Sequence, residues 1–312
     1  MITLRRYTKA DKNLWNEFVK KSKNGLFLFD RNYMDYHADR FTDHSLMFYE
    51  NGTLLALLPA NVKDGTLYSH QGLTFGGIVS DSRMTTARML VLLEKLLTYG
   101  KSHKVKKIVY KVIPSVYQRL PAQEDLYGLY RHHARLVGRD IASVVDQTQP
   151  VPFQDSMKRV LKTAMRLNLT IKENHDYAEF MGIVSSLLAT KYHARPTHTT
   201  EEITRLAAGF PGEIRLFTVR EKEDMLGGVI IYEYPTVAHC QYIAASARGK
   251  KLGVLSPLFH KLLTRYFADK RYFSFGKSTE QDGAYLNEGL IRNKEHYGGR
   301  GVVHDIYELP VR

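Results

Sequence analysis

Apolar runs in the first half of the chain predict three strands, a helix and a fourth strand. The three strands are SLMFYE (45–50), LLALLPANV (54–62) and LYSHQGL (67–73), separated by the turn-like triplets NGT and DGT. Apolar residues then recur at helical spacing up to Gly100, with Ser82 as a suitable N-cap. The run KKIVYKV (106–112) predicts the strand that follows this helix.

The second half repeats this order. The predicted strands are EIRLFTV (213–219), MLGGVIIYEY (225–234) and VAHCQYIAAS (237–246). A helix with Ser256 as its N-cap and Pro257 at its first position follows. Its period places six apolar residues on one face: Leu258, Phe259, Leu262, Leu263, Tyr266 and Phe267. The run RYFSFG (271–276) predicts the last strand of the unit.

The repeated order predicts a duplicated unit in an α+β protein. Leu97 aligns with Leu263 and Ile108 with Tyr272, at offsets of 166 and 164 residues. Two unrelated units of this common order are the alternative. The proline-containing segment 146–156 suits a connection, so we expect domains at 1–147 and 148–312. The strand 302–309 either closes the second sheet or returns to the first domain.

Composition fits an ordinary globular protein. The chain has 312 residues, of which 44% are hydrophobic and 25% charged, so it can bury a sizeable core. We expect no signal peptide or membrane span, because charges interrupt the longest apolar clusters. The single cysteine, Cys240, excludes an internal disulfide and fits a reducing compartment, so the expected location is the cytoplasm. A buried structural cysteine is favoured over a nucleophile.

The excess of basic residues indicates an anionic partner. The formal net charge is +13, which attracts phosphates, nucleic acid or an anionic bilayer surface. Lys158, Lys162 and Arg166 form a basic stripe on a predicted helix at 157–169, beside Arg159. This stripe is either the solvated face of an amphipathic helix or a surface for tRNA or a nucleotide-sugar pyrophosphate.

Several motifs of the second half together resemble a known family. They are MKRVLKTAMRLNL (157–169), KYHARPTHT (191–199), HCQYIAAS (239–246), SPLFHKLL (256–263), FSFGKSTE (273–280) and GLIRNKEHYGG (289–299). The order of three antiparallel strands, a helix and a parallel strand is similar to the core of the GNAT acyltransferase fold. Two copies in one chain resemble the Fem family of peptidoglycan-bridge aminoacyltransferases. The resemblance covers about residues 155–309, whereas the first half agrees in layout and in YSHQGLTFGG (68–77).

The resemblance implies tandem GNAT-like domains and N-acyl transfer. The acyl or aminoacyl group would come from acyl-CoA or aminoacyl-tRNA and pass to an amine on a cell-envelope precursor, either a peptidoglycan peptide or an amino sugar. It implies no tightly bound cofactor. No metal is expected either, because His193 and His198 lack the spacing of a helical zinc motif. The oligomeric state is left open.

In a GNAT core the third and fourth strands of the unit separate, and the reacting groups meet there. This implies His239, Gln241 and Tyr242 on one side and the strand end at Phe275 and Gly276 on the other. We expect three catalytic residues: Glu280 as the general base, Lys294 beside the acyl oxygen, and Tyr242. Lys277 and Ser278 are expected to bind substrate, with His239 and Gln241.

Lys294 occupies the position of a lysine that the Fem family carries before its glycine pair, here Gly298 and Gly299. The family usually has an aromatic residue before this lysine, whereas this chain has Asn293. A purely structural network is the alternative, in which Ser278 and Thr279 hold a helix start and Glu280 pairs with a cation. The loop 191–199 is similar to the segment that borders the acceptor site, which makes His193 and Arg195 candidates for binding an anionic acceptor.

The segment SARGKKLGVLSP (246–257) stands where an acetyl-CoA enzyme keeps its pyrophosphate loop. Reading the GNAT pattern from Arg248 gives Lys251 at its first glycine and Gly253 at its second. Pro257 places the predicted helix start several residues later, which counts against acetyl-CoA. Donor phosphates would then bind Arg248, Lys250 and Lys251, or these residues form an ordinary solvated loop.

Two other classes of function remain open. The chain could be a non-catalytic duplicated module that binds nucleic acid or anionic glycans in a basic site. It could also be a helper whose first half pairs with another transferase.

Overall fold

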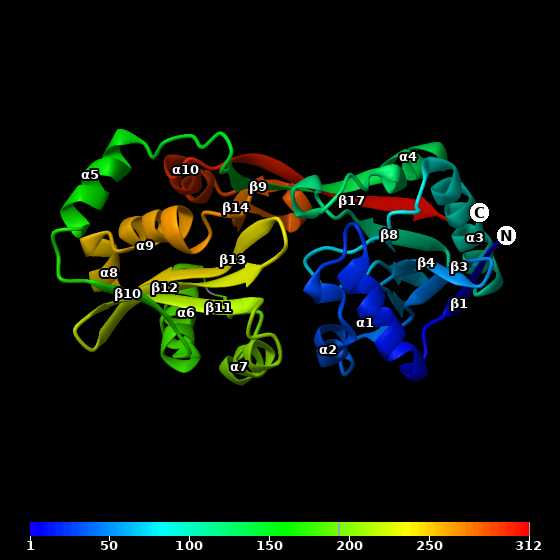
Figure 1. The fold of residues 1–312 in the computed structure, drawn as a ribbon, viewed down its shortest axis with the longest axis horizontal. Coiled ribbons are helices and arrows are strands. Elements are labelled where there is room, and N and C mark those ends of the chain that lie inside the picture. Colours follow the sequence, from blue (N-terminus) through cyan, green and yellow to red (C-terminus); the bar gives the residue numbers. More distant parts are fainter. Residues whose placement is uncertain (193, 312) are drawn as a thin grey trace. The chain divides into compact units, whose positions relative to one another are not determined.

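The computed structural model describes residues 1–192 and 194–311 and shows a mixed α+β fold, as the sequence predicts (Figure 1). The chain forms two compact units. The N-terminal unit comprises Met1–Ile141, Thr279–Tyr285 and Val303–Arg312, and the C-terminal unit comprises Ala142–Ser278 and Leu286–Val302. The chain therefore first changes units inside strand β9 (Arg135–Asp146), before the proline-containing segment 146–156. The last strand, β17 (Arg300–Pro310), ends in the N-terminal unit.

The N-terminal unit contains two sheets. The first has the order β1, β3, β4, β7, and its strands are antiparallel. The second pairs β2 with β5, β5 with β6, β6 with β8, and β8 with β17. The strands are β1 (Ile2–Arg6), β2 (Thr42–Asp43), β3 (Leu46–Glu50), β4 (Thr53–Leu58), β5 (Asn61–Lys63), β6 (Thr66–Tyr68), β7 (Val79–Ser80) and β8 (Lys107–Lys111). The predicted strand 54–62 is thus two strands, which Pro59 separates because proline has no N–H to donate to a ladder.

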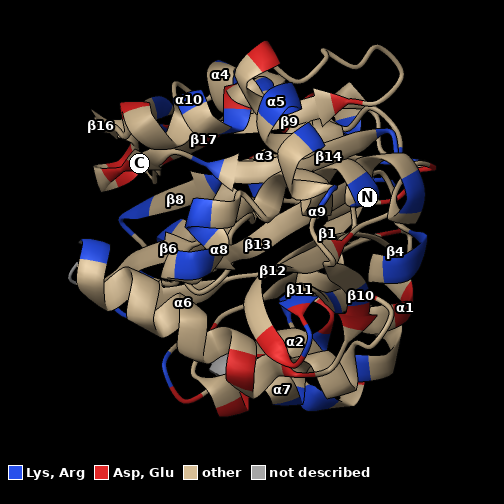
Figure 2. Cartoon of the chain, turned by 90° about the vertical axis from the view of Figure 1, so that its left-hand side faces the viewer, with Lys and Arg blue, Asp and Glu red and all other residues tan. Residues whose placement is uncertain are grey.

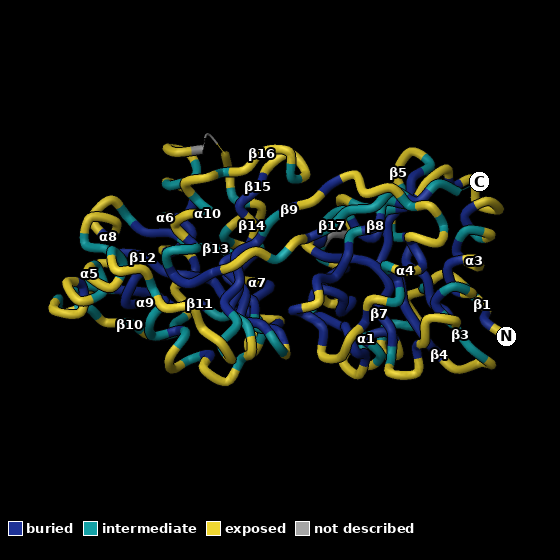
Figure 3. Tube along the Cα trace, turned by 90° about the horizontal axis from the view of Figure 1, so that it is seen from above, coloured by how far each residue is buried: buried dark blue, intermediate teal, exposed yellow. Residues whose placement is uncertain are grey.

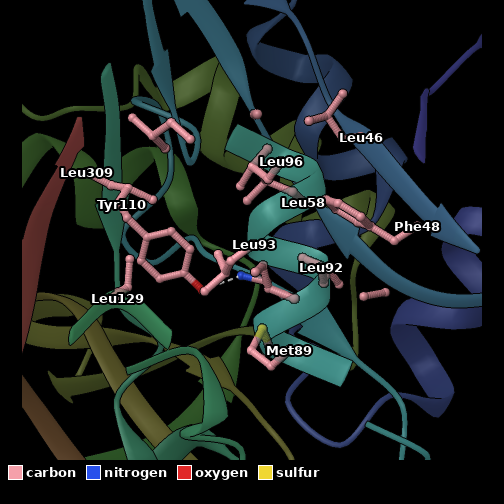
Figure 4. Packing of buried hydrophobic residues seen from close by; sticks show 14 of the residues in the cluster. Leu46, Phe48, Leu58, Met89, Leu92, Leu93, Leu96, Tyr110, Leu129 and Leu309 are labelled. Carbon is pink, nitrogen blue, oxygen red and sulfur yellow. Dashed lines mark hydrogen bonds between the residues drawn. The ribbon is translucent and has the colours of Figure 1, made fainter. Parts of the chain in front are cut away.

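Four helices belong to this unit, with short 3-10 turns between elements. The helices are α1 (Lys12–Lys21), α2 (Arg31–Met34), α3 (Thr86–Ser102) and α4 (Glu124–Arg131). The 3-10 turns are Lys9–Asp11, Phe27–Phe29, Asp35–His37, Ser115–Tyr117 and Gln281–Gly283. Helix α3 begins later than predicted, because its N-cap is Thr85, whose side chain accepts from the backbone N–H of Arg88, and not Ser82. One face of α3 packs into the core against β3, β4 and β8 (Figure 4).

A buried acid and phenol lie at the edge of this core. The hydroxyl of Tyr110, whose ring lies in the core (Figure 4), accepts a hydrogen bond from the N–H of Ile78 at 2.7 Å. The same hydroxyl donates to Oδ2 of Asp125 at 2.6 Å. Gly77 has φ +85° here, and a Cβ at this position would lie 2.7 Å from the Tyr110 hydroxyl. Burial raises the pKa of Asp125 to about 6, since desolvation penalises the charged carboxylate.

The C-terminal unit is built on one sheet of order β10, β11, β12, β13, β14, followed by the part of β9 in this unit. The strands are β10 (Thr170–Asn174), β11 (Ile214–Glu221), β12 (Asp224–Glu233), β13 (Val237–Ala245) and β14 (Tyr272–Lys277). Neighbours are antiparallel except for β13 and β14, which run parallel. The predicted order of three antiparallel strands and a parallel fourth is confirmed, and these strands are buried along most of their length (Figure 3).

Helices cover both faces of this sheet. Helix α6 packs on β12 and β13 from one face, and α9 packs on β11 and β12 from the other (Figure 1). The helices are α5 (Asp155–Ala164), α6 (Tyr177–Tyr192), α7 (Thr200–Gly209), α8 (Ala247–Leu252), α9 (Leu255–Lys261) and α10 (Glu288–His296). Two short strands, β15 (Thr279–Glu280) and β16 (Tyr285–Leu286), pair with each other before α10.

The predicted helix start at Ser256 is wrong. Helix α8 starts directly after β13, with Ser246 as its N-cap, and Gly253 in the left-handed region separates it from α9. Pro257 stands inside α9, close enough to its start that the missing N–H breaks no helix bond. The hydroxyl of Ser256 lies 3.0 Å from that of Tyr297 and caps nothing.

Two further features concern the described residues only. None of the helices in ranges 1–192 and 194–311 is both long and apolar enough to cross a membrane. Within the same ranges, no group of three or more His, Cys, Asp or Glu side chains is arranged to hold a metal ion.

The raised pKa of Asp125 predicts that the N-terminal unit loses stability as pH rises. The folded unit binds the Asp125 proton more tightly than the unfolded chain, so its contribution is full below pH 3.8 and is lost as pH passes 6. Asp125→Asn should flatten this fall, which amounts to at most about 3 kcal/mol. Urea unfolding followed by the fluorescence of Trp15, the single tryptophan, measures it. The exposed Asp64→Asn is the control, and an unchanged slope in Asp125→Asn would contradict the prediction.

Candidate active site

The ladder between β13 and β14 is short. It comprises three pairs, Val237 with Tyr272, Ala238 with Phe273 and His239 with Ser274. Beyond His239, strand β13 continues to Ala245 paired with β12 alone. A bulge accompanies this change, because Tyr242 pairs with Ile230 and Cys240 with Ile231, which leaves Gln241 as the extra residue. A bulge redirects the side chains and backbone groups beside it, and this one lies in β13 at the residues where the sequence predicts the site.

Gly276 forms the matching irregularity in β14. Its φ is +73°, and the register of β14 against β9 shifts between Ser274 and Lys277. A Cβ at Gly276 would lie 3.4 Å from Cε1 of His239. The hydroxyl of Ser274 accepts from the N–H of Gly276 at 3.2 Å and lies 3.2 Å from Nδ1 of His239. These contacts hold the end of β14 in a conformation that favours glycine.

Lys294 extends from the last turn of α10 to this strand end. Its ammonium donates to the carbonyl oxygen of Gly276 at 3.0 Å and to that of Lys277 at 2.6 Å. The residue is 5% exposed, and no carboxylate among the described residues pairs with it. Desolvation therefore lowers the pKa of Lys294 to about 8. An ammonium has three N–H groups, so one remains for a further acceptor.

Helix α10 is fixed at both of its ends. At its start the N-cap Asn287 accepts from the N–H of Leu290 and donates its own N–H to the carbonyl oxygen of Ser278 at 2.9 Å. At its end the ring of Tyr297 packs against Phe259 with centroids 5.0 Å apart, and its hydroxyl meets Ser256. Lys294 therefore has little freedom to leave the strand end.

The predicted glycine pair ends this helix. Gly298 has φ +90°, and a Cβ there would lie 2.2 Å from the carbonyl oxygen of Val151. A Cβ on Gly299 would lie 3.0 Å from the carbonyl oxygen of Lys294. Both positions require a residue without a Cβ, so the pair turns the chain sharply from the lysine-bearing helix into β17.

The polar residues after β14 separate into different environments. The side chain of Lys277 is exposed, whereas Ser278 is 2% exposed and its Oγ has no hydrogen-bond partner among the described residues. Thr279 donates to Asp140 at 2.6 Å and caps no helix. Glu280 is exposed and belongs to the N-terminal unit, whereas Lys294 and Tyr242 belong to the C-terminal unit.

Tyr242 is engaged with the loop before α7. Its hydroxyl accepts from the backbone N–H of His198 at 3.2 Å and lies 2.8 Å from Nδ1 of the same residue. Burial raises the pKa of Tyr242, while hydrogen bonds from His198 and Thr197 oppose the rise. Thr199 and Glu202 form a capping box at the start of α7. Arg195 in this loop is exposed, and the predicted acceptor residue His193 lies outside the described residues.

Cys240 lies between these groups and is buried. Burial raises the pKa of its thiol, which the charge of Lys294 only partly offsets. A thiol that keeps its proton is a poor nucleophile, so Cys240 has the properties of a packing residue.

The predicted phosphate-binding residues lie on α8. Arg248 pairs with Glu221, whereas Lys250 and Lys251 are exposed and without an ion pair among the described residues. Helix α5 is next to this helix, since a Cβ on Gly253 would lie 2.3 Å from Cγ1 of Val160. Arg159, Lys162 and Arg166 on or just after α5 are also exposed and unpaired within the described chain. We call these five exposed residues of α8 and the α5 region the basic face; Figure 2 shows Lys and Arg positions on both helices.

Three residues of the site were missed by the sequence analysis: His198, Ser274 and Tyr297. Each acts through a partner far away in sequence, since His198 meets Tyr242, Ser274 meets His239, and Tyr297 meets Ser256. Only His198 had a local signal, its place directly before the capping residue Thr199.

The family comparison agrees with this geometry. Residues 155–285 match the model of the acetyltransferase (GNAT) domain, which contains the strands β10 to β14. No curated protein sequence matches the chain significantly.

Solved structures resemble the whole chain. The crystal structure of FemX has a TM-score of 0.69 at 10% identity over 97% of this chain and 96% of the other. The C-terminal domain of a putative lysylphosphatidylglycerol synthetase from Agrobacterium fabrum has a TM-score of 0.56 at 12% identity over 94% and 91%. A tandem GNAT protein from the clavulanic acid pathway has a TM-score of 0.50 at 10% identity over 100% and 99%. At such identities the likeness shows the fold. Residues 155–285 are therefore similar to the acetyltransferase (GNAT) domain, and the fold of the chain as a whole is similar to those of FemX and of a tandem GNAT protein.

Proposed function

We propose that this protein is an N-acyltransferase that moves an acyl or aminoacyl group from acyl-CoA or aminoacyl-tRNA to an amine on a cell-envelope precursor. The acceptor would be a peptidoglycan peptide or an amino sugar, and the reaction would take place in the cytoplasm, where both donors are made. The observation that carries the proposal is Lys294, a buried ammonium without a carboxylate partner at the end of a GNAT strand. Such a charge is costly to keep unless a negative charge develops beside it.

The reaction develops that charge on the acyl oxygen. The neutral amine attacks the acyl carbon, a C–N bond forms, and the carbonyl electron pair moves to oxygen. When this tetrahedral intermediate collapses, the bond to the donor's sulfur or ribose oxygen breaks, and the amine proton is transferred to a base. The third N–H of Lys294 can donate to the oxyanion, which is stabilised strongly in a site with little water. Glu280 is the candidate base, although it is exposed in the N-terminal unit.

The equivalent place in the N-terminal unit lacks this free donor. There the parallel strands β6 and β8 are joined further by Ser69, whose N–H donates to Val109 and whose hydroxyl accepts from the N–H of Lys111. The ammonium of Lys111 donates to three carbonyl oxygens, those of His70, Gln71 and Leu73. Three acceptors use all three N–H groups. This contrast supports chemistry in the C-terminal unit.

The basic face supports a donor that carries phosphates. Lys250 and Lys251 on α8 and three residues of the α5 region present their charges to solvent. Phosphate groups of coenzyme A or of a tRNA acceptor stem would bind these cations, and tRNA would contact more of them at once. On the acceptor side, Arg195 is an exposed cation in a loop that His198 and Tyr242 hold against β13.

The same face also supports a second candidate function, a module that binds nucleic acid or anionic glycans without catalysis. The lysine variant below separates the two candidates. If Lys294→Met and Glu280→Gln leave ligand affinity and every acyl-transfer assay unchanged, binding alone is the better account.

Lys294→Met should lose acyl transfer and keep the fold. We expect kcat to fall about 10²- to 10³-fold, as for the removal of an oxyanion donor. The assay is transfer from acetyl-CoA or alanyl-tRNA to a lysine-containing peptide. Lys222→Met, in the turn between β11 and β12, is the matched control and should be fully active.

The same variant tests the burial of the lysine by stability. Because the folded chain binds the Lys294 proton less tightly than the unfolded chain, the free energy of unfolding should rise from pH 8 to the ordinary lysine pKa of 10.5. Urea unfolding of Lys294→Met should lack this rise. A rise equal to that of the wild type would show that Lys294 is hydrated in solution.

The donor can be identified by thermal shift with coenzyme A, acetyl-CoA and charged tRNA at two salt concentrations. We expect stabilisation by the true donor to weaken in the triple variant Arg159→Ala, Lys162→Ala, Lys251→Ala. The slope of log affinity against log salt should fall by about 0.9 for each lost contact to duplex phosphate. The control variant Lys95→Ala, Lys101→Ala, Lys106→Ala has the same charge change in the N-terminal unit. Equal effects of the two variants would contradict a role for the basic face.

Tyr242→Phe should raise the KM for the acceptor several-fold and leave kcat within about twofold, because the phenol hydroxyl is engaged in holding the acceptor loop. Steady-state kinetics with varied peptide acceptor measures both constants. A hundredfold fall in kcat at unchanged KM would instead assign the phenol to proton transfer.

A further inference from the structure

The hydroxyl of Ser278 is buried and without a partner in a unit whose other buried polar groups are mostly hydrogen-bonded. The residue is 2% exposed, and its Oγ meets no donor or acceptor in the described ranges 1–192 and 194–311. A buried hydroxyl without a hydrogen bond destabilises the fold. A group that is kept in this state is a candidate for binding a ligand atom.

Ser278 stands next to the ammonium of Lys294. Nζ of Lys294 is 2.6 Å from the carbonyl oxygen of Lys277, and that carbonyl is bonded directly to the nitrogen of Ser278. The backbone of Ser278 is held from its other side, since its own carbonyl oxygen accepts from Asn287 at the start of α10. One helix thus fixes both residues, Ser278 through its N-cap Asn287 and Lys294 through its last turn.

We propose that Ser278 and Lys294 together form a two-donor oxyanion hole for the acyl oxygen of the donor. The inference rests on the proposed function and adds to it a second catalytic residue. Each group has one N–H or O–H that no acceptor in the described chain takes up. Two donors about 3 Å from one oxygen must lie within about 6 Å of each other. The contact of Lys294 Nζ with the peptide that joins Lys277 to Ser278 is compatible with this limit.

The oxygen gains its charge only after the amine attacks. The C–N bond forms, the carbonyl pair becomes the third lone pair of the oxygen, and the O–H of Ser278 and an N–H of Lys294 donate to it without transferring their protons. When the carbonyl re-forms, the bond to sulfur or ribose oxygen breaks and both donors are released. Oγ of Ser278 is buried, so the oxyanion hole requires the Ser278 side chain to rotate about its Cα–Cβ bond when the acyl oxygen enters.

Ser278→Ala distinguishes this role from a packing role. The structure predicts an unchanged or raised Tm, because the variant removes an unpartnered polar group. The oxyanion hole predicts that kcat and kcat/KM fall together by about 10²-fold at unchanged KM, since the bond exists only in the transition state. In the double variant with Lys294→Met the two losses should be less than multiplicative, because the groups act on one oxygen.

The outcomes separate the inference from the proposed function. If Lys294→Met is inactive and Ser278→Ala retains full kcat, the second donor is wrong and the transferase remains. If the wild type transfers from neither acetyl-CoA nor alanyl-tRNA, the proposed function fails, and the hole is then tested by binding. Methylphosphonate, an oxyanion mimic, should raise the pKa of Lys294 measured by NMR of its side chain, and should bind Ser278→Ala about tenfold more weakly. No response of Lys294 to this anion, or an equal affinity of the two proteins, would overturn the inference.

Discussion

The C-terminal unit depends on an exchange of hydrogen-bond partners at the end of β14. After His239 and Ser274 the ladder between the parallel strands stops, and the carbonyl oxygens of Gly276 and Lys277 accept from Lys294 instead. Buried carbonyl groups need a donor, and a lysine from another element supplies it without continuing the sheet. The result is a strand end that keeps its pairing with β9 but no longer pairs with β13, with a positive charge fixed beside it.

Burying the ammonium of Lys294 costs free energy of hydration, and its pKa reflects this cost. Desolvation lowers the pKa of Lys294 to about 8, and two neutral carbonyls replace only part of its hydration. The surroundings reduce the freedom of the side chain, because α10 is held by Asn287 at its start and by Tyr297 at its end. A preorganised and poorly solvated cation is suited to stabilise charge that appears during a reaction, since little has to rearrange at that moment.

The sequence predicted the order of elements well and their partners poorly. Period and turn residues predicted β11 to β14 of the C-terminal unit but not β10, and the GNAT and Fem resemblance pointed to Lys294 and the glycine pair. Caps were less certain: Ser256 has the residue type of an N-cap, yet its hydroxyl meets Tyr297, 41 residues later. The link between Tyr242 and His198 spans 44 residues. Such contacts depend on how elements pack, and no local pattern encodes them.

The two units show why a shared layout does not imply shared chemistry. Both place a lysine ammonium against backbone carbonyls near a parallel strand pair, but Lys111 has three such acceptors and Lys294 has two. In the first unit the lysine holds the loop of His70, Gln71 and Leu73, and Ser69 extends the strand pairing. In the second unit, a bulge at Gln241 and the positive φ of Gly276 accompany the early end of the pairing. Lys294 there has two carbonyl acceptors, so one of its N–H groups is left for another acceptor. Where the strand ladder stops therefore decides how many backbone carbonyl groups each ammonium meets, and under the proposed function the unused N–H of Lys294 is the group that reaches the acyl oxygen.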